Sequence, residues 1–208
     1  MSIQTLNNPR YASLICSLLV TGAVVLGAVS SEQNTLPDEL VAASGLPQEM
    51  PKPGPEHAWL AKQIGTWETK HQLRFGPNTP WIKYTGTVKT KSSCGGFWIT
   101  TVTESTILGM PFEGQQQLGF DQHKKEFVAT WIDSFADYLV VYTGTLSDDK
   151  KALTLSGSVR DPNNLDKGIP MKMVVTMKSD DELATQMFVP GPDGKDYVNM
   201  EIEHKRKK

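Results

Sequence analysis

Apolar and polar residues alternate with a period of two along most of the chain after residue 65. The first such stretch is the clearest, because one face is mostly apolar and the other is entirely polar. The first face holds Trp67, Thr69, His71, Leu73 and Phe75, and the second holds Glu68, Lys70, Gln72 and Arg74. Alternation of this kind predicts a β-strand that has one side on a core.

The same pattern recurs in later segments, which are separated by short links rich in turn residues such as Gly191-Pro192-Asp193-Gly194. These segments are roughly 81–91, 97–108, 111–120, 125–133, 137–147, 151–160, 170–178, 182–190 and 196–206. Short links favour antiparallel neighbours, and a meander that closes on itself leaves no exposed edge strand. The sequence therefore predicts an all-β fold, an antiparallel up-and-down β-barrel of about ten strands.

A short helix is predicted before the first strand. It begins near Pro55 and ends by Gly65, and its apolar face consists of His57, Leu60, Ala61 and Ile64. The preceding segment, 31–54, is rich in proline and lacks aromatic residues, so it cannot bury enough surface to fold. We predict a flexible spacer at residues 31–54 and a barrel domain at residues 55–208.

The first 30 residues have the form of a targeting segment. Arg10 precedes a long apolar stretch at residues 11–29, and Ala28-Val29-Ser30 supplies the small residues that signal peptidase requires. We predict a signal peptide at residues 1–30, cleaved after Ser30, and export to the periplasm or the extracellular space. The apolar stretch is nearly long enough to cross a bilayer, so an uncleaved membrane anchor is the alternative.

Charge and composition exclude several classes of function. The net charge is −2, and the basic residues form no aromatic-rich stripe, so nucleic acid is not an expected partner. The predicted mature chain keeps only Cys94, which excludes an intramolecular disulfide. The histidines show no zinc spacing, and no nucleotide-binding or Gly-x-Ser-x-Gly motif occurs. We expect neither a metal nor a cofactor.

The start of the barrel resembles a known signature. A short helix followed by Gly65-Thr66-Trp67 and a strand is similar to lipocalin-like barrels, in which the tryptophan plugs the closed end and a late arginine lies across it. Arg206 is the candidate arginine. Across residues 55–208 the chain also resembles the bacterial DUF1579 family, which has no assigned activity. The matching motifs include Gly109-Met110-Pro111-Phe112-Glu113-Gly114, Leu118-Gly119-Phe120-Asp121, Thr130-Trp131-Ile132-Asp133-Ser134 and Met200-Glu201-Ile202.

Related barrels, the nitrobindins, bind haem through a histidine near the end of the chain, and His204 is the residue to compare. Its neighbours Glu203, Lys205 and Arg206 indicate a solvated strand end. Haem needs an apolar slot around its axial ligand. The comparison therefore does not change the expectation that no cofactor is bound.

A barrel of this size either fills its interior or keeps room for one small ligand. The candidate ligand-binding residues occupy those alternate positions of their strands that should face the barrel interior. They are His71, Gln116, Trp131, Asp133 and Tyr142. Each has a structural alternative, because buried polar groups are commonly retained for the hydrogen bonds they make.

Three functions follow from these alternatives. Fold analogy favours an exported protein that binds a small, largely apolar ligand. A cell-envelope module with a filled barrel is the second function. An enzyme that uses Asp133 with His71 is the third, although no triad or paired-carboxylate spacing requires it. The oligomeric state stays open.

The targeting segment gives a direct prediction. When the full gene is expressed in an exporting host, N-terminal sequencing of the purified protein should begin at or very near Ser31, because small residues follow the apolar stretch there. Recovery of the chain from the membrane fraction with Met1 retained would instead establish the anchored alternative.

Overall fold

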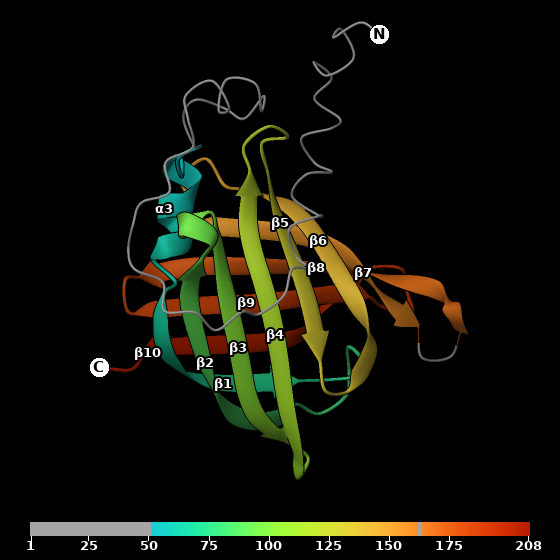
Figure 1. Ribbon diagram of the computed structural model, residues 1–208. Helices are drawn as coiled ribbons and strands as arrows, with labels where there is room; N and C mark the ends of the chain where they lie inside the picture. Colours follow the sequence, from blue (N-terminus) through green and yellow to red (C-terminus); the bar gives the residue numbers. More distant parts are fainter. Residues whose placement is uncertain (1–50, 162–163) are drawn as a thin grey trace, which may run out of the picture. The chain divides into compact units, whose positions relative to one another are not determined.

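The computed structural model describes residues 51–161 and 164–208. Residues 1–50, which hold the predicted signal peptide and most of the predicted spacer, lie outside the described part of the chain. Ten antiparallel strands form a closed barrel in chain order, and one short helix precedes them (Figure 1). The structure thus confirms the fold predicted from the alternation pattern. No helix within the described ranges is long and apolar enough to span a bilayer.

The elements follow the predicted segments closely. The helix α3 spans Pro55–Ala61, and a 3-10 turn at Cys94–Gly96 joins β2 to β3. The strands are β1 (Gly65–Leu73), β2 (Ile82–Ser93), β3 (Trp98–Ile107), β4 (Met110–Asp121), β5 (Glu126–Asp133), β6 (Ala136–Leu146), β7 (Ala152–Asp161), β8 (Asn164–Ser179), β9 (Glu182–Pro190) and β10 (Asp196–Arg206). β8 begins six residues earlier than the predicted start at 170, because its extension pairs with the end of β7.

Pairing between the first and last strands closes the barrel. β1 and β10 are antiparallel in a register that runs from Trp67 opposite Arg206 to Leu73 opposite Met200. The side chains of Trp67, Thr69 and His71 are at most 5% exposed, as their predicted parity requires. Phe75 does not continue this face. β1 ends at Leu73, and Phe75 lies in the following loop with 74% of its surface exposed.

The helix covers one end of the barrel. Trp59 and Leu60 belong to the main core, and the Trp59 ring meets Phe127 of β5 edge to face at 6.0 Å. The prediction that Leu60 is buried is confirmed. The prediction that Ala61 belongs to the same face is wrong, because Ala61 is exposed and Trp59 is buried instead. The helix is only two turns long and ends before Gly65, so the predicted spacing of its apolar face extends beyond the helix itself.

A tryptophan and an arginine complete this closed end. The guanidinium of Arg206 lies 4.1 Å from the centre of the Trp67 ring, as predicted, and Trp67 Nε1 donates to the Gln63 carbonyl at 2.9 Å. Arg206 also donates to the Lys62 and Ile64 carbonyls at 2.8 and 2.7 Å. These carbonyls follow the helix and have no partner within it, so Arg206 ties the helix end to the last strand.

This contact predicts a coupled loss of stability. Trp67→Ala should lower the free energy of unfolding by about 3 to 5 kcal/mol, because it removes a fully buried aromatic side chain. Arg206→Ala should cost less, and a double-mutant cycle should give a coupling of about 0.5 to 2 kcal/mol in urea unfolding. Lys205→Ala, on the exposed face of the same strand, is the control. Additive losses for Trp67 and Arg206 would contradict the interpretation.

Candidate functional site

The barrel encloses a cavity of about 420 Å³. Its walls are inward-facing side chains from every strand, and its outer part is bounded by Phe112, Phe135 and Ala136, which lie at the β3–β4 and β5–β6 hairpins. Those hairpins are at the end of the barrel opposite α3 (Figure 1). Trp67 lines the cavity from the α3 end, and Phe135 lines it while it is 51% exposed, so the cavity reaches the surface at the hairpin end.

All five predicted site residues line this cavity. His71 comes from β1, Gln116 from β4, Trp131 and Asp133 from β5, and Tyr142 from β6. The inward parity assigned to them is thus observed, although their role in binding stays a prediction. Glu104 of β3 does not line the cavity: it is exposed on the outside and forms an ion pair with Lys89 at 2.8 Å.

Asp133 fixes the position of Trp131. Its Oδ2 accepts a hydrogen bond from Trp131 Nε1 at 2.7 Å, and its Oδ1 accepts one from the backbone N–H of Phe135 at 2.8 Å. A Cβ on Gly114 would lie 2.4 Å from the Trp131 ring, so glycine there makes room for the indole. Phe112 stacks against the same ring with centroids 6.5 Å apart. The carboxylate therefore orients an aromatic wall of the cavity and stabilises the β5–β6 turn.

His71 lies deep in the cavity wall. Its Nε2 is hydrogen-bonded to Thr69 Oγ1 at 2.7 Å, and its ring stacks on Tyr84 with centroids 4.6 Å apart. Its Nδ1 is buried and has no hydrogen-bond partner among the described residues. Burial lowers the pKa of His71 to about 4, so the imidazole is neutral at pH 7.

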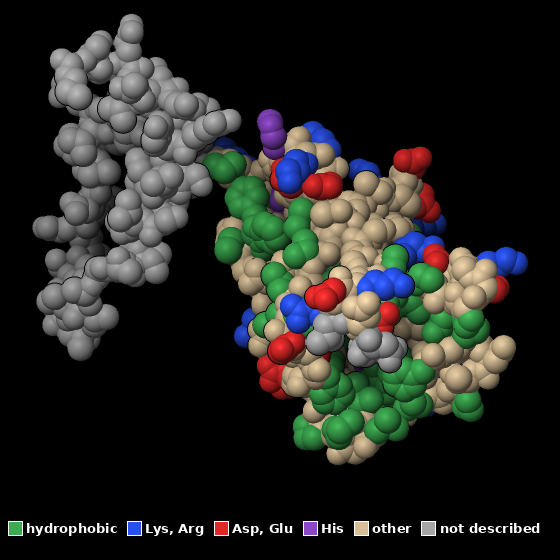
Figure 2. Space-filling view, turned by 90° about the vertical axis from the view of Figure 1, so that its right-hand side faces the viewer, with side chains coloured by type: hydrophobic (Ala, Val, Ile, Leu, Met, Phe, Trp, Pro, Cys, Tyr) green, Lys and Arg blue, Asp and Glu red, His purple; other side chains and the backbone are tan. Residues whose placement is uncertain are grey.

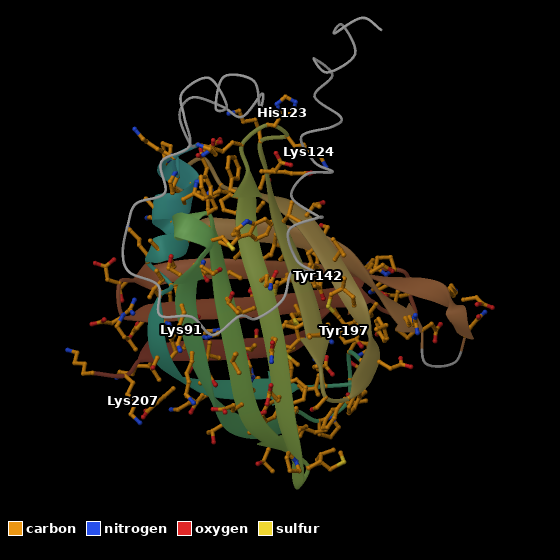
Figure 3. The ribbon with its side chains drawn as sticks, viewed as in Figure 1. Lys91, His123, Lys124, Tyr142, Tyr197 and Lys207 are labelled. Carbon is orange, nitrogen blue, oxygen red and sulfur yellow. The ribbon has the colours of Figure 1, made fainter. Side chains whose placement is uncertain are left out.

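Tyr142 contributes both core packing and a polar tip. The side chain is 5% exposed and belongs to the main core, while its hydroxyl contacts the Met171 sulfur at 3.4 Å. Burial is the main cause that raises the pKa of Tyr142 to about 12, so it stays protonated. In Figure 3 Tyr142 is labelled within the barrel, whereas Lys91 and Lys207 project from its outside.

His204 corrects the prediction of a solvated strand end. Its ring lines the cavity, and its Nε2 is hydrogen-bonded to Thr185 Oγ1 of β9 at 3.1 Å. Burial, with a smaller effect of charge on His71, lowers the pKa of His204 to about 4. The charged neighbours Glu203 and Lys205 face outward because parity alternates along β10. His204 alternates along the strand with Ile202 and Arg206, and this spacing was the signal in the sequence that could have identified it as an inward-facing residue.

The structure does not pair Asp133 with His71. Asp133 is hydrogen-bonded to Trp131 and Phe135, and His71 is hydrogen-bonded to Thr69. Neither residue is hydrogen-bonded to the other. An imidazole whose pKa is lowered to about 4 and whose Nδ1 lacks an orienting carboxylate is a poor general base at pH 7. The acid–base arrangement that the enzyme alternative required is therefore not assembled by these two residues. Within residues 51–161 and 164–208, no group of three His, Cys, Asp or Glu side chains could hold a metal ion.

A closed, ten-stranded, up-and-down antiparallel barrel with an internal cavity, and with a helix and a Trp–Arg pair at one end, defines the class of this protein. Its sequence matches the DUF1579 family, described as proteins of unknown function, over residues 52–206. The chain belongs to this family. A comparison with curated protein sequences gives no match.

Solved structures share the barrel architecture. Rv2717c from M. tuberculosis is 14% identical, with a TM-score of 0.56, and the match covers 74% of this chain and 99% of that one. A fluorescence-activating β-barrel designed de novo is 15% identical over 71% of this chain and 95% of its own, with a TM-score of 0.40. The similarity to Rv2717c shows the fold, and at these identities neither match defines a function.

Burial of His71 predicts a loss of stability in acid. The folded-state pKa of about 4 lies below the unfolded value of 6.5, so the unfolded chain takes up protons first as the pH falls. Stability should be complete above pH 6.5 and decline toward pH 4, with His71 contributing about 2 to 3 kcal/mol of that decline.

Urea unfolding at pH 7 and pH 4.5 measures this effect. His71→Gln should lose less stability between the two pH values than the unsubstituted protein does. His123→Gln is the matched control, because His123 is exposed in the β4–β5 turn. Equal acid sensitivity of the His71 variant and the unsubstituted protein would contradict the assignment.

Proposed function

We propose that this protein binds a small, largely apolar ligand inside the barrel. The observation that carries the proposal is the cavity of about 420 Å³, which is within the usual size range of small-molecule sites. Its walls combine many apolar side chains with a few polar groups on rigid strands, which is the usual composition of such sites. An envelope module with a filled barrel would not need this space.

The apolar part of the wall suits ligands of variable shape. Met171, Met173, Met187 and Met200 line the cavity, and methionine side chains adapt to irregular neighbours. At the outer end, Phe135 lines the cavity while it is 51% exposed, and Phe75, Leu108 and Met110 are at least 50% exposed. The space-filling view shows hydrophobic side chains gathered in its lower part (Figure 2). An apolar entrance of this kind would admit an apolar ligand.

We place this activity outside the cytoplasm. Support for export comes from the sequence alone, through Arg10, the apolar stretch and the small residues before Ser31. A spacer at residues 31–54 would separate the barrel from the point of cleavage or anchorage. Binding in the barrel does not depend on which of these two endings the N-terminal segment has.

Blocking the cavity tests the proposal. Ala136→Trp places a large side chain at the entrance, whereas Val141→Trp adds the same side chain on the outer face of the same strand, where Val141 is 50% exposed. The uncharged dye N-phenyl-1-naphthylamine should bind to the unsubstituted protein and to the Val141 variant, and about tenfold or more weakly to the Ala136 variant. Fluorescence titration measures all three. Equal binding by both variants would place the dye outside the barrel and contradict the proposal.

A further inference from the structure

Both imidazoles and most hydroxyl groups of the cavity wall lie on one side of the barrel, whereas Gln116 and Asp133 come from β4 and β5, between that side and β6. The strands β9, β10, β1, β2 and β3 contribute histidine, threonine and serine side chains, and β6, β7 and β8 contribute valine, methionine and tyrosine. The polar side includes His71, Thr103, Ser105, Thr185 and His204. The cavity therefore has a hydrogen-bonding side and an apolar side.

Two buried polar atoms on this side lack a partner. His71 Nδ1 and Ser105 Oγ are both buried and make no hydrogen bond to any described residue, and both side chains line the cavity. Burial of an unsatisfied polar atom is destabilising, because the atom loses its bonds to water. Each atom can be satisfied by a polar group that enters the cavity.

The strand register places Ser105 beside Thr69, which is the hydrogen-bond partner of His71. Gly86 of β2 pairs with Thr69 on one side and with Ser105 on the other. A Cβ on Gly86 would lie 3.2 Å from Thr69 Oγ1 and 3.0 Å from Ser105 Cβ, so only glycine lets these side chains approach each other. Since Thr69 Oγ1 is bonded to His71 Nε2, Ser105 lies beside the Thr69–His71 pair.

The charge of the wall limits what this group can be. Among the described residues no lysine or arginine lines the cavity, and the labelled lysines Lys91, Lys124 and Lys207 lie on the outside of the barrel (Figure 3). Burial keeps His71 and His204 neutral at pH 7. The described part of the wall has one carboxylate, at Asp133, and both of its oxygens already accept hydrogen bonds. An anionic head would lose its water without gaining a counter-charge, and a cationic head at His71 and Ser105 would meet only neutral groups there.

We propose that the cavity selects neutral amphiphiles over charged ones, and that the hydroxyl, ester or amide group of the ligand binds at His71 and Ser105. The neutral imidazole and the serine hydroxyl can each donate or accept a hydrogen bond. The apolar chain of the ligand then lies against Met171, Met173 and Tyr142. This inference rests on the proposed binding function and names the chemical class of the ligand.

Amphiphiles with one chain length and different heads test the selectivity. Dodecan-1-ol, dodecanoate and dodecylammonium compete with N-phenyl-1-naphthylamine for the full-length protein at pH 7.5. Dodecan-1-ol should displace the dye at a concentration about tenfold or more below that of either ion. If either ion matches dodecan-1-ol, neutral selectivity is overturned while binding in the barrel stands. If the dye itself does not bind, the proposed function fails as well.

A serine variant tests the position of the head group. Ser105→Ala should weaken dodecan-1-ol about threefold to tenfold, the effect of one hydrogen bond, and should weaken the dye by a smaller factor. Ser156→Ala, on the exposed face of β7, is the matched control. An unchanged affinity for dodecan-1-ol in the Ser105 variant would overturn the assigned head-group site. Because dye binding is measured on the same sample, it verifies that the variant is folded.

Discussion

The number of strands sets the conditions that the rest of this structure must meet. Eight strands make a barrel whose interior side chains can just fill, and ten strands make a wider one. The extra interior must be occupied by something other than the ordinary wall residues. At one end α3 supplies Trp59 and Leu60, and Trp67 with Arg206 completes the closure. At the other end no described element plays this part, so the same geometry that requires a plug also produces the cavity.

The cavity combines two chemical environments that the strand order keeps apart. The inward side chains of β9, β10 and β1 to β3 include both imidazoles and most of the hydroxyl groups, and those of β6 to β8 are apolar apart from two tyrosine hydroxyls. Hydrogen bonds between the two histidines and Thr69 and Thr185 hold the imidazole rings in place without adding charge. The interior is therefore polar on one side and neutral overall, apart from the Asp133 carboxylate that orients Trp131.

Much of the fold was predictable from the sequence, and the composition of the site only in part. Parity placed His71, Gln116, Trp131, Asp133 and Tyr142 on the wall, because a strand has only two faces. Parity could not give the cavity volume, which depends on how side chains from opposite strands meet. Local charge was misleading at His204, where Glu203 and Lys205 suggested solvent although alternation turns the histidine inward. The enzyme alternative combined Asp133 with His71, but the hydrogen-bond partners of Asp133 are two residues away in its own turn, a contact that the hydrophobic pattern does not encode.

The pairing of β1 with β10 has a consequence for how the chain folds. The two strands lie at opposite ends of the domain, and their register joins Trp67 to Arg206. Contacts between such distant segments require closure of a long loop before they stabilise the chain, which slows folding. A nascent chain that lacks its last strand has two unpaired edges, and such edges readily pair with other chains. The domain thus becomes a single closed unit only after its final residues are available, and protection from aggregation during synthesis is needed until that moment.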